Sequence, residues 1–143
     1  MRNLILDNSV VIEACQNPDL NAPLFEALNG ARKADVEIWI YVAEASAILL
    51  SLSSTNPLAG VFGKQKEPNQ ESVFKTFVRD CQWLAALSED LSDLDCADPI
   101  RAGLLKASTR LGEDTKVLTF SQDRLQSGPP FITLTDLASL LPP

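Results

Sequence analysis

The stretch NLILDNSVVIEAC (residues 3–15) decides the fold class of this chain. Residues 3–6 form a short apolar run that ends at Asp7, and the next two side chains, Asn8 and Ser9, are typical helix caps. Apolar residues then recur at helical spacing, at Val10, Val11, Ala14 and Cys15. The pattern predicts a strand, an acidic junction and a helix, in that order.

The same alternation continues along the chain. VEIWIYV (36–42) is rich in β-branched and aromatic residues and predicts a buried strand, which runs directly into a helix, AEASAILLSL (43–52). TKVLTF (115–120) and FITL (131–134) predict two further strands. Helices are also expected at 22–34, at 70–87, from Pro99 to about Gly112, and over TDLASLL (135–141) behind a Thr135 cap. Residues 53–70 predict a loop or flap, and the acidic stretch 88–98 predicts a solvated loop.

Strands that alternate with helices predict an α/β fold with a parallel sheet covered on both faces. The 143 residues show no internal repeat or linker, so residues 1–143 are expected to form a single domain. In such sheets, ligands bind in the crevice beyond the carboxyl ends of the strands. Side chains that directly follow a strand are therefore the first candidates for a site.

Composition excludes several classes of function. The chain has no histidine, which excludes His-ligated zinc, His-ligated haem, Ser-His-Asp catalysis and a histidine general base. Twelve Lys and Arg against 19 Asp and Glu give a net charge of −7, which excludes a strongly basic protein that coats nucleic acid. A nuclease remains compatible with this acidity, because a bound divalent cation can supply positive charge at the site.

The cysteine pattern and the chain start predict a cytoplasmic protein. Cys15, Cys81 and Cys96 are an odd number without metal-site spacing, which favours reduced thiols over a disulfide framework. The start MRNLILDNSVV becomes polar too early for a signal peptide, and the apolar stretch 38–52 is too short to span a bilayer and contains Glu44. We expect an intracellular, soluble chain without a membrane partner.

Four carboxylates lie at the predicted strand ends. Asp7, Glu44 and Asp123 each follow a strand by one to three residues, and Asp98 begins the helix that should lie beside the same sheet edge. Carboxylates gathered without an intervening cation would repel one another, so such a cluster favours one or two Mg²⁺ or Mn²⁺ ions. Each acid also has a structural interpretation as a helix cap or turn residue. The joint pattern favours a metal site, and Asp95 is the alternative to Asp98.

Four segments together resemble the motif regions of PIN-domain nucleases, especially the prokaryotic toxin-type branch. These are LILDNSVVIEA, YVAEASAILL, DPIRAGLLKAS and KVLTFSQDRL, and the resemblance extends from Leu4 to the C-terminal FITLTDLASLL. It implies a three-layer α/β/α sandwich with a central, mainly parallel sheet. It also implies cleavage of RNA by water activated on Mg²⁺ or Mn²⁺.

The resemblance assigns roles to individual residues. Asp7, Glu44, Asp98 and Asp123 match the family's acids as catalytic residues and metal ligands. Asn8 and Ser9 match polar residues beside the first acid, and Ser121 matches the polar partner of the fourth. Arg101 and Arg124 are candidates to line the approach of RNA, with solubilising surface charge as the alternative.

The leading hypothesis is therefore a metal-dependent endoribonuclease of the PIN type, acting as the toxin of a toxin–antitoxin pair. The resemblance further implies a homodimer and an inhibitory antitoxin protein. The alternative is a catalytically inactive PIN-like scaffold that binds RNA or protein. The acidic net charge and the small number of basic residues motivate this alternative, because little positive charge is left to attract RNA.

Overall fold

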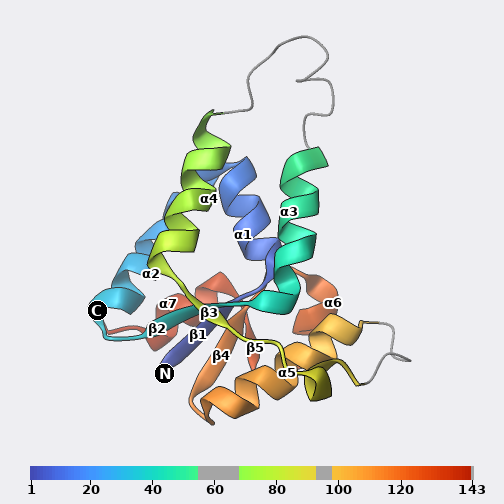
Figure 1. The fold of residues 1–143 in the computed structure, drawn as a ribbon. Coiled ribbons are helices and arrows are strands. Elements are labelled where there is room, and N and C mark those ends of the chain that lie inside the picture. Colours follow the sequence, from blue (N-terminus) through green and yellow to red (C-terminus); the bar gives the residue numbers. More distant parts are fainter. Residues whose placement is uncertain (55–67, 93–97, 143) are drawn as a thin grey trace.

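The computed structural model describes residues 1–54, 68–92 and 98–142, and its centre is a five-stranded parallel sheet with the strand order β3-β2-β1-β4-β5 (Figure 1). The strands are β1 (Asn3–Leu6), β2 (Glu37–Tyr41), β3 (Gln82–Leu84), β4 (Thr115–Leu118) and β5 (Phe131–Ile132). All four neighbouring pairs are parallel. The predicted α/β class with a parallel central sheet is confirmed.

Helices cover both faces of this sheet. They are α1 (Asn8–Gln16), α2 (Ala22–Lys33), α3 (Ala45–Ser54), α4 (Pro68–Asp80), α5 (Pro99–Leu111), α6 (Gln122–Leu125) and α7 (Leu134–Leu140), with short 3₁₀ helices at Pro18–Asn21, Val42–Glu44 and Ser88–Leu91. Leu4 and Leu6 of β1 pack into a core with α1 to α4 and α7, whereas Ile5 packs on the other face with α5. The sheet with helices on both faces is the expected three-layer α/β/α sandwich. Because both faces are covered, the strands are apolar at nearly every position.

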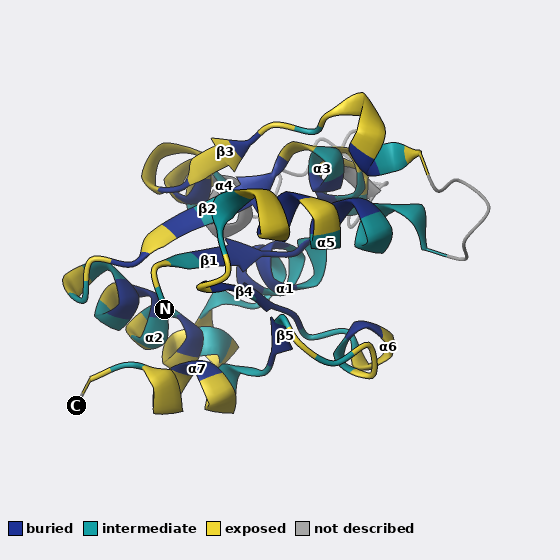
Figure 2. Cartoon of the chain, turned by 90° about the horizontal axis from the view of Figure 1, so that it is seen from below, coloured by how far each residue is buried: buried dark blue, intermediate teal, exposed yellow. Residues whose placement is uncertain are grey.

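The strand order brings the end of β1 to the centre of the molecule. From β1 the chain first builds β2 and β3 on one side, and then returns to add β4 and β5 on the other. The carboxyl ends of β1 and β4 therefore lie at the switch point where open parallel sheets bind ligands. Figure 2 shows β1 and β4 buried, in contrast to the largely exposed edge strand β3.

The predicted helix over 70–87 is wrong in its second half. Helix α4 ends at Asp80, and residues 82–84 form the edge strand β3, which pairs with β2. The apolar spacing continues through Phe77 and Cys81, so the sequence pattern does not mark the change. Pairing with a strand that is distant in sequence decides the structure of this segment.

Smaller differences occur at other predicted boundaries. The last helix is capped by Thr133 rather than Thr135, because Thr133 and Asp136 form a reciprocal capping box that also ends β5 at Ile132. The predicted flap 53–70 lies mostly in residues 55–67, outside the described residues, and its two ends belong to α3 and α4. Among the described residues, no helix is long and apolar enough to cross a membrane.

The acidic stretch 88–98 is not simply a solvated loop. Asp90 is fully buried, accepts hydrogen bonds from the Tyr41 hydroxyl at 2.9 Å and the Leu87 N–H at 3.0 Å, and pairs with Arg110 at 2.5 Å. Burial alone would raise the pKa of Asp90, but the hydrogen bonds from Arg110, Leu87 and Tyr41 outweigh it and hold that pKa below its ordinary value. This network fastens the second half of α5 to the sheet.

Candidate active site

Asp7 lies at the end of β1 and is the N-cap of α1. Its backbone is extended, its Oδ1 accepts hydrogen bonds from the Val10 N–H at 3.3 Å and the Ser9 hydroxyl at 2.5 Å, and no part of it is exposed. Its Oδ2 accepts from the Thr119 hydroxyl and lies 3.2 Å from Nη1 of Arg124. The capping role and the site role of Asp7 therefore coexist, one for each carboxylate oxygen.

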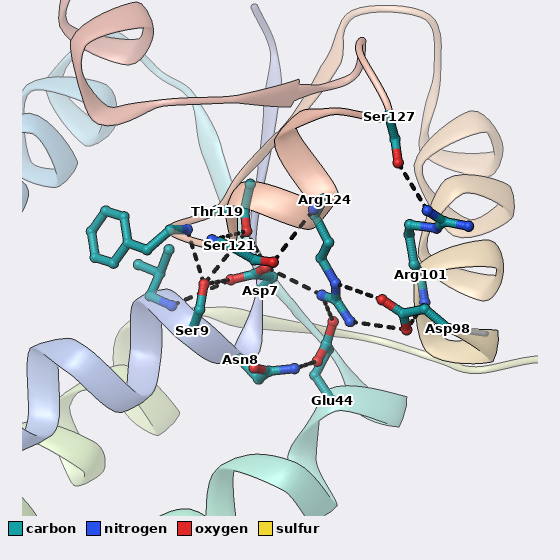
Figure 3. A network of polar contacts seen from close by, with 12 residues as sticks. Asp7, Asn8, Ser9, Glu44, Asp98, Arg101, Thr119, Ser121, Arg124 and Ser127 are labelled. Atoms are coloured by element: carbon teal, nitrogen blue, oxygen red, sulfur yellow. Dashed lines mark hydrogen bonds and ion pairs between the residues drawn. The ribbon is translucent and has the colours of Figure 1, made fainter.

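Two hydroxyl groups tie the end of β4 to this carboxylate. Ser9 Oγ donates to Asp7 and accepts from the Phe120 N–H at 2.9 Å, while Thr119 Oγ1 accepts from the Ser121 N–H at 3.0 Å (Figure 3). Thr119 is buried and was not among the predicted site residues. Its position directly after the last residue of β4, like that of Asp7 after β1, is the signal that would have found it.

Glu44 ends the 3₁₀ turn that follows β2 and is fully buried. Its Oε2 accepts a hydrogen bond from the Asn8 amide, and its Oε1 accepts from Nη1 of Arg124 at 2.6 Å. Burial raises the pKa of the Glu44 carboxyl above its ordinary value, and the partners Arg124 and Asn8 oppose this shift only in part. Glu44 is thus held in one orientation from both sides.

Asp98 is the N-cap of α5, as the Asp-Pro sequence predicts. Its Oδ1 accepts from the Arg101 N–H at 3.0 Å, and its Oδ2 lies 3.2 Å from Nε of Arg124. Partial burial would raise its pKa, but the hydrogen bonds from Arg101 and Arg124 outweigh this and hold the pKa below its ordinary value. Asp98 is the most accessible of the three acids, with 36% of its side chain exposed.

Arg124 extends from α6 into the centre of these acids (Figure 3). Its side chain is only 8% exposed, and its guanidinium pairs with Asp7, Glu44 and Asp98 at the same time. Burial alone would lower its pKa, but the surrounding carboxylates raise it above the ordinary value, so the group stays charged. The alternative that Arg124 is a solubilising surface charge is wrong, because the residue is a buried internal counter-ion, whereas its contact with RNA stays a prediction.

Only some of the other predicted site residues lie at the cluster. Asn8, Ser9 and Ser121 lie at the cluster, where Ser121 caps α6 and accepts from the Arg124 N–H at 3.4 Å. Asp123 is exposed, and no hydrogen bond or ion pair joins its side chain to another described residue. Arg101 points away from the acids, and its Nη1 donates to Ser127 at 3.0 Å. Asp95 lies outside the described residues.

The donors of the cluster fit a hard divalent cation in kind, because carboxylate and hydroxyl oxygens are the ligands that Mg²⁺ and Mn²⁺ prefer. Their arrangement does not yet form a metal centre: within the described ranges, no group of three or more acidic or thiol side chains is placed to hold a metal ion. The Arg124 guanidinium lies between the three carboxylates. A cation could use these ligands only where Arg124 withdraws.

An open groove begins beside the cluster. It has a volume of about 590 Å³ and is lined by Asn8, Ser9, Ile12, Glu13, Asn21 and Phe120. Asn8 and Ser9 belong to both the groove and the acid cluster, so the two are continuous. Asp7, Glu44 and Asp98 do not themselves line the groove.

Comparison with known proteins adds no family assignment. No family model matches the chain, and neither curated proteins nor solved structures give a match.

Proposed function

We propose that this chain is a metal-dependent endoribonuclease of the PIN-domain type. The observation that supports the proposal best is the convergence of Asp7, Glu44 and Asp98, from three separate elements, on one point at the switch of a parallel sheet. Two of these acids are fully buried. Buried carboxylates are costly to maintain, so an arrangement of this kind favours a functional role.

The chain's own residues would divide the work. Asp7, Glu44 and Asp98 would hold the cation, which supplies an activated water and stabilises charge on the phosphodiester. Ser9 and Thr119 orient Asp7, and Asn8 orients Glu44, by hydrogen bonds that are already in place. The groove beside Asn8 and Ser9 would hold the RNA chain with its phosphate near the carboxylates.

The partners and the biological role extend this proposal. We propose the toxin role, an antitoxin protein and a homodimer on the strength of the sequence resemblance. An antitoxin would inhibit the enzyme by covering the groove or the acids. These partners have their own test, which is whether the protein of the neighbouring reading frame binds this chain and blocks RNA cleavage.

The decisive experiment compares Asp7→Asn with wild type. Asparagine also caps a helix, so the fold should be retained while one ligand charge is lost. Mn²⁺ binding by calorimetry and cleavage of single-stranded RNA with and without Mn²⁺ should both be lost in the variant. The matched control is Asp35→Asn, because Asp35 is exposed before β2 at the opposite sheet edge and has a φ of 61°, which asparagine tolerates.

One observation favours a second candidate, a catalytically inactive PIN-like module that binds RNA or protein. Arg124 already pairs with all three acids, and a protein that needs no metal would retain such a pairing. This candidate predicts no Mn²⁺ binding that depends on Asp7. Metal-dependent cleavage by wild type, lost in Asp7→Asn and kept in Asp35→Asn, would exclude it.

A further inference from the structure

The Arg124 guanidinium is shared among all three acids of the site. Its Nη1 reaches Asp7 at 3.2 Å and Glu44 at 2.6 Å, and its Nε and Nη2 face the two oxygens of Asp98 at 3.2 and 3.5 Å. A planar guanidinium carries five N–H donors, and its two-pronged contact with both Asp98 oxygens is one that an ammonium group cannot form. The position that a shared cation would take is therefore the position of this side chain.

One positive charge does not balance this cluster. When ionised, Asp7, Glu44 and Asp98 carry three negative charges against the single charge of Arg124. A divalent cation would compensate more of the charge, but it would repel the guanidinium at this short range.

The segment that carries Arg124 is lightly anchored. Helix α6 has only four residues, and Arg124 is the only one of them that is buried. The segment continues to Gly128, whose φ of 78° marks a turn before β5. Leu125, the apolar residue of α6, is only partly buried against the core, so Arg124 can leave the acids by a change of its own side-chain conformation, which breaks its ion pairs and leaves the helix in place.

We propose that Arg124 is a built-in competitor of the divalent cation, so that the paired state and the metal-bound state exclude each other. This inference rests on the proposed function, because it assumes that the three acids are metal ligands. Through this competition, Arg124 would lower the affinity for the metal and, with it, the nuclease activity. RNA phosphates offer the displaced guanidinium a new partner, which would couple substrate binding to metal binding.

The test is a Mn²⁺ titration by calorimetry on wild type and Arg124→Gln at equal ionic strength. The control is Arg79→Gln, the same charge change at an arginine whose side chain is 74% exposed on α4. We expect Arg124→Gln to bind Mn²⁺ at least tenfold more tightly than wild type and the control. It should also melt at a lower temperature without Mn²⁺ and recover with it, because free metal stabilises the state that binds it.

Arg124→Lys is the second variant in case Arg124→Gln does not fold. It keeps the charge but not the shared hydrogen bonds, so its Mn²⁺ affinity should lie between those of wild type and Arg124→Gln. Equal or weaker Mn²⁺ binding by the Arg124 variants, or none by any protein, would overturn the competition.

RNA cleavage separates this inference from the proposed function. Tighter Mn²⁺ binding by Arg124→Gln without RNA cleavage would leave the competition standing and remove the nuclease proposal. Metal-dependent cleavage by wild type, together with equal Mn²⁺ affinity in all variants, would support the nuclease proposal and remove the competition.

Discussion

The cap of α5 offers the sharpest prediction, because Asp98 has two separable roles. Asp98→Ala removes the N-cap bond to the Arg101 N–H, worth about 1 kcal/mol, since alanine offers no acceptor. It also removes the pair with Arg124, worth at most about 1 kcal/mol because the Asp98 side chain is partly exposed. Asp98→Asn keeps the cap and loses only the charge pair. We expect losses of about 2 kcal/mol for alanine and under about 1 kcal/mol for asparagine.

Urea unfolding measures the difference. With a slope near 2 kcal/mol/M, the midpoint should fall by about 1 M for Asp98→Ala and by less than about 0.5 M for Asp98→Asn. Equal midpoints for the two variants would refute the capping role. The same proteins also test the choice of the third acid, because metal-dependent cleavage should be lost in Asp98→Asn and kept in Asp95→Asn. The opposite result would make Asp95 the ligand.

Two further predictions concern the core and the buried acid. A Cβ at Gly103 would lie 3.0 Å from the Asp90 carbonyl and 3.0 Å from the Tyr41 hydroxyl, whereas one at Gly30 would make an ordinary contact at 3.5 Å. Alanine should therefore cost about 1–3 kcal/mol more at position 103 than at 30, measured by thermal melting, and equal melting temperatures would contradict this packing. The raised pKa of Glu44 means that the folded state binds more protons than the unfolded state just above pH 4.5, so stability falls as pH rises through that window. Glu44→Gln should remove this fall in unfolding free energy, and an unchanged slope would exclude Glu44 as its source.

The local pattern predicted most of the fold. Runs such as NLIL and EIWIY are buried on both faces, so their apolar character alone predicted strands β1 and β2. Asp7 and Glu44 follow these two strands, and parallel strands end at the same sheet edge, so the sequence also predicted that these two acids lie close together. β3 was missed because three residues at a sheet edge carry almost no periodic signal.

The orientations of Asp123 and Arg124 could not be predicted from the sequence. In sequence, Asp123 and Arg124 are neighbours in an exit turn, and either could face the other acids. Ser121 caps α6 and sets its phase, which buries Arg124 and exposes Asp123. Which of the two neighbours faces inward depends on one capping bond and on carboxylates far away in the sequence. Neither of these appears in a local sequence pattern.

By itself, the sequence determined the parallel α/β sheet, its approximate strands and an acidic edge at their carboxyl ends. Apolar periodicity and helix caps involve residues close in the chain, so they can be recognised from the sequence alone. Only the tertiary structure decided which charges meet: Asp7, Glu44 and Asp98 with Arg124, and Asp90 with Arg110. Charge pairing in a buried site depends on the distance between elements far apart in sequence, and folding alone sets that distance.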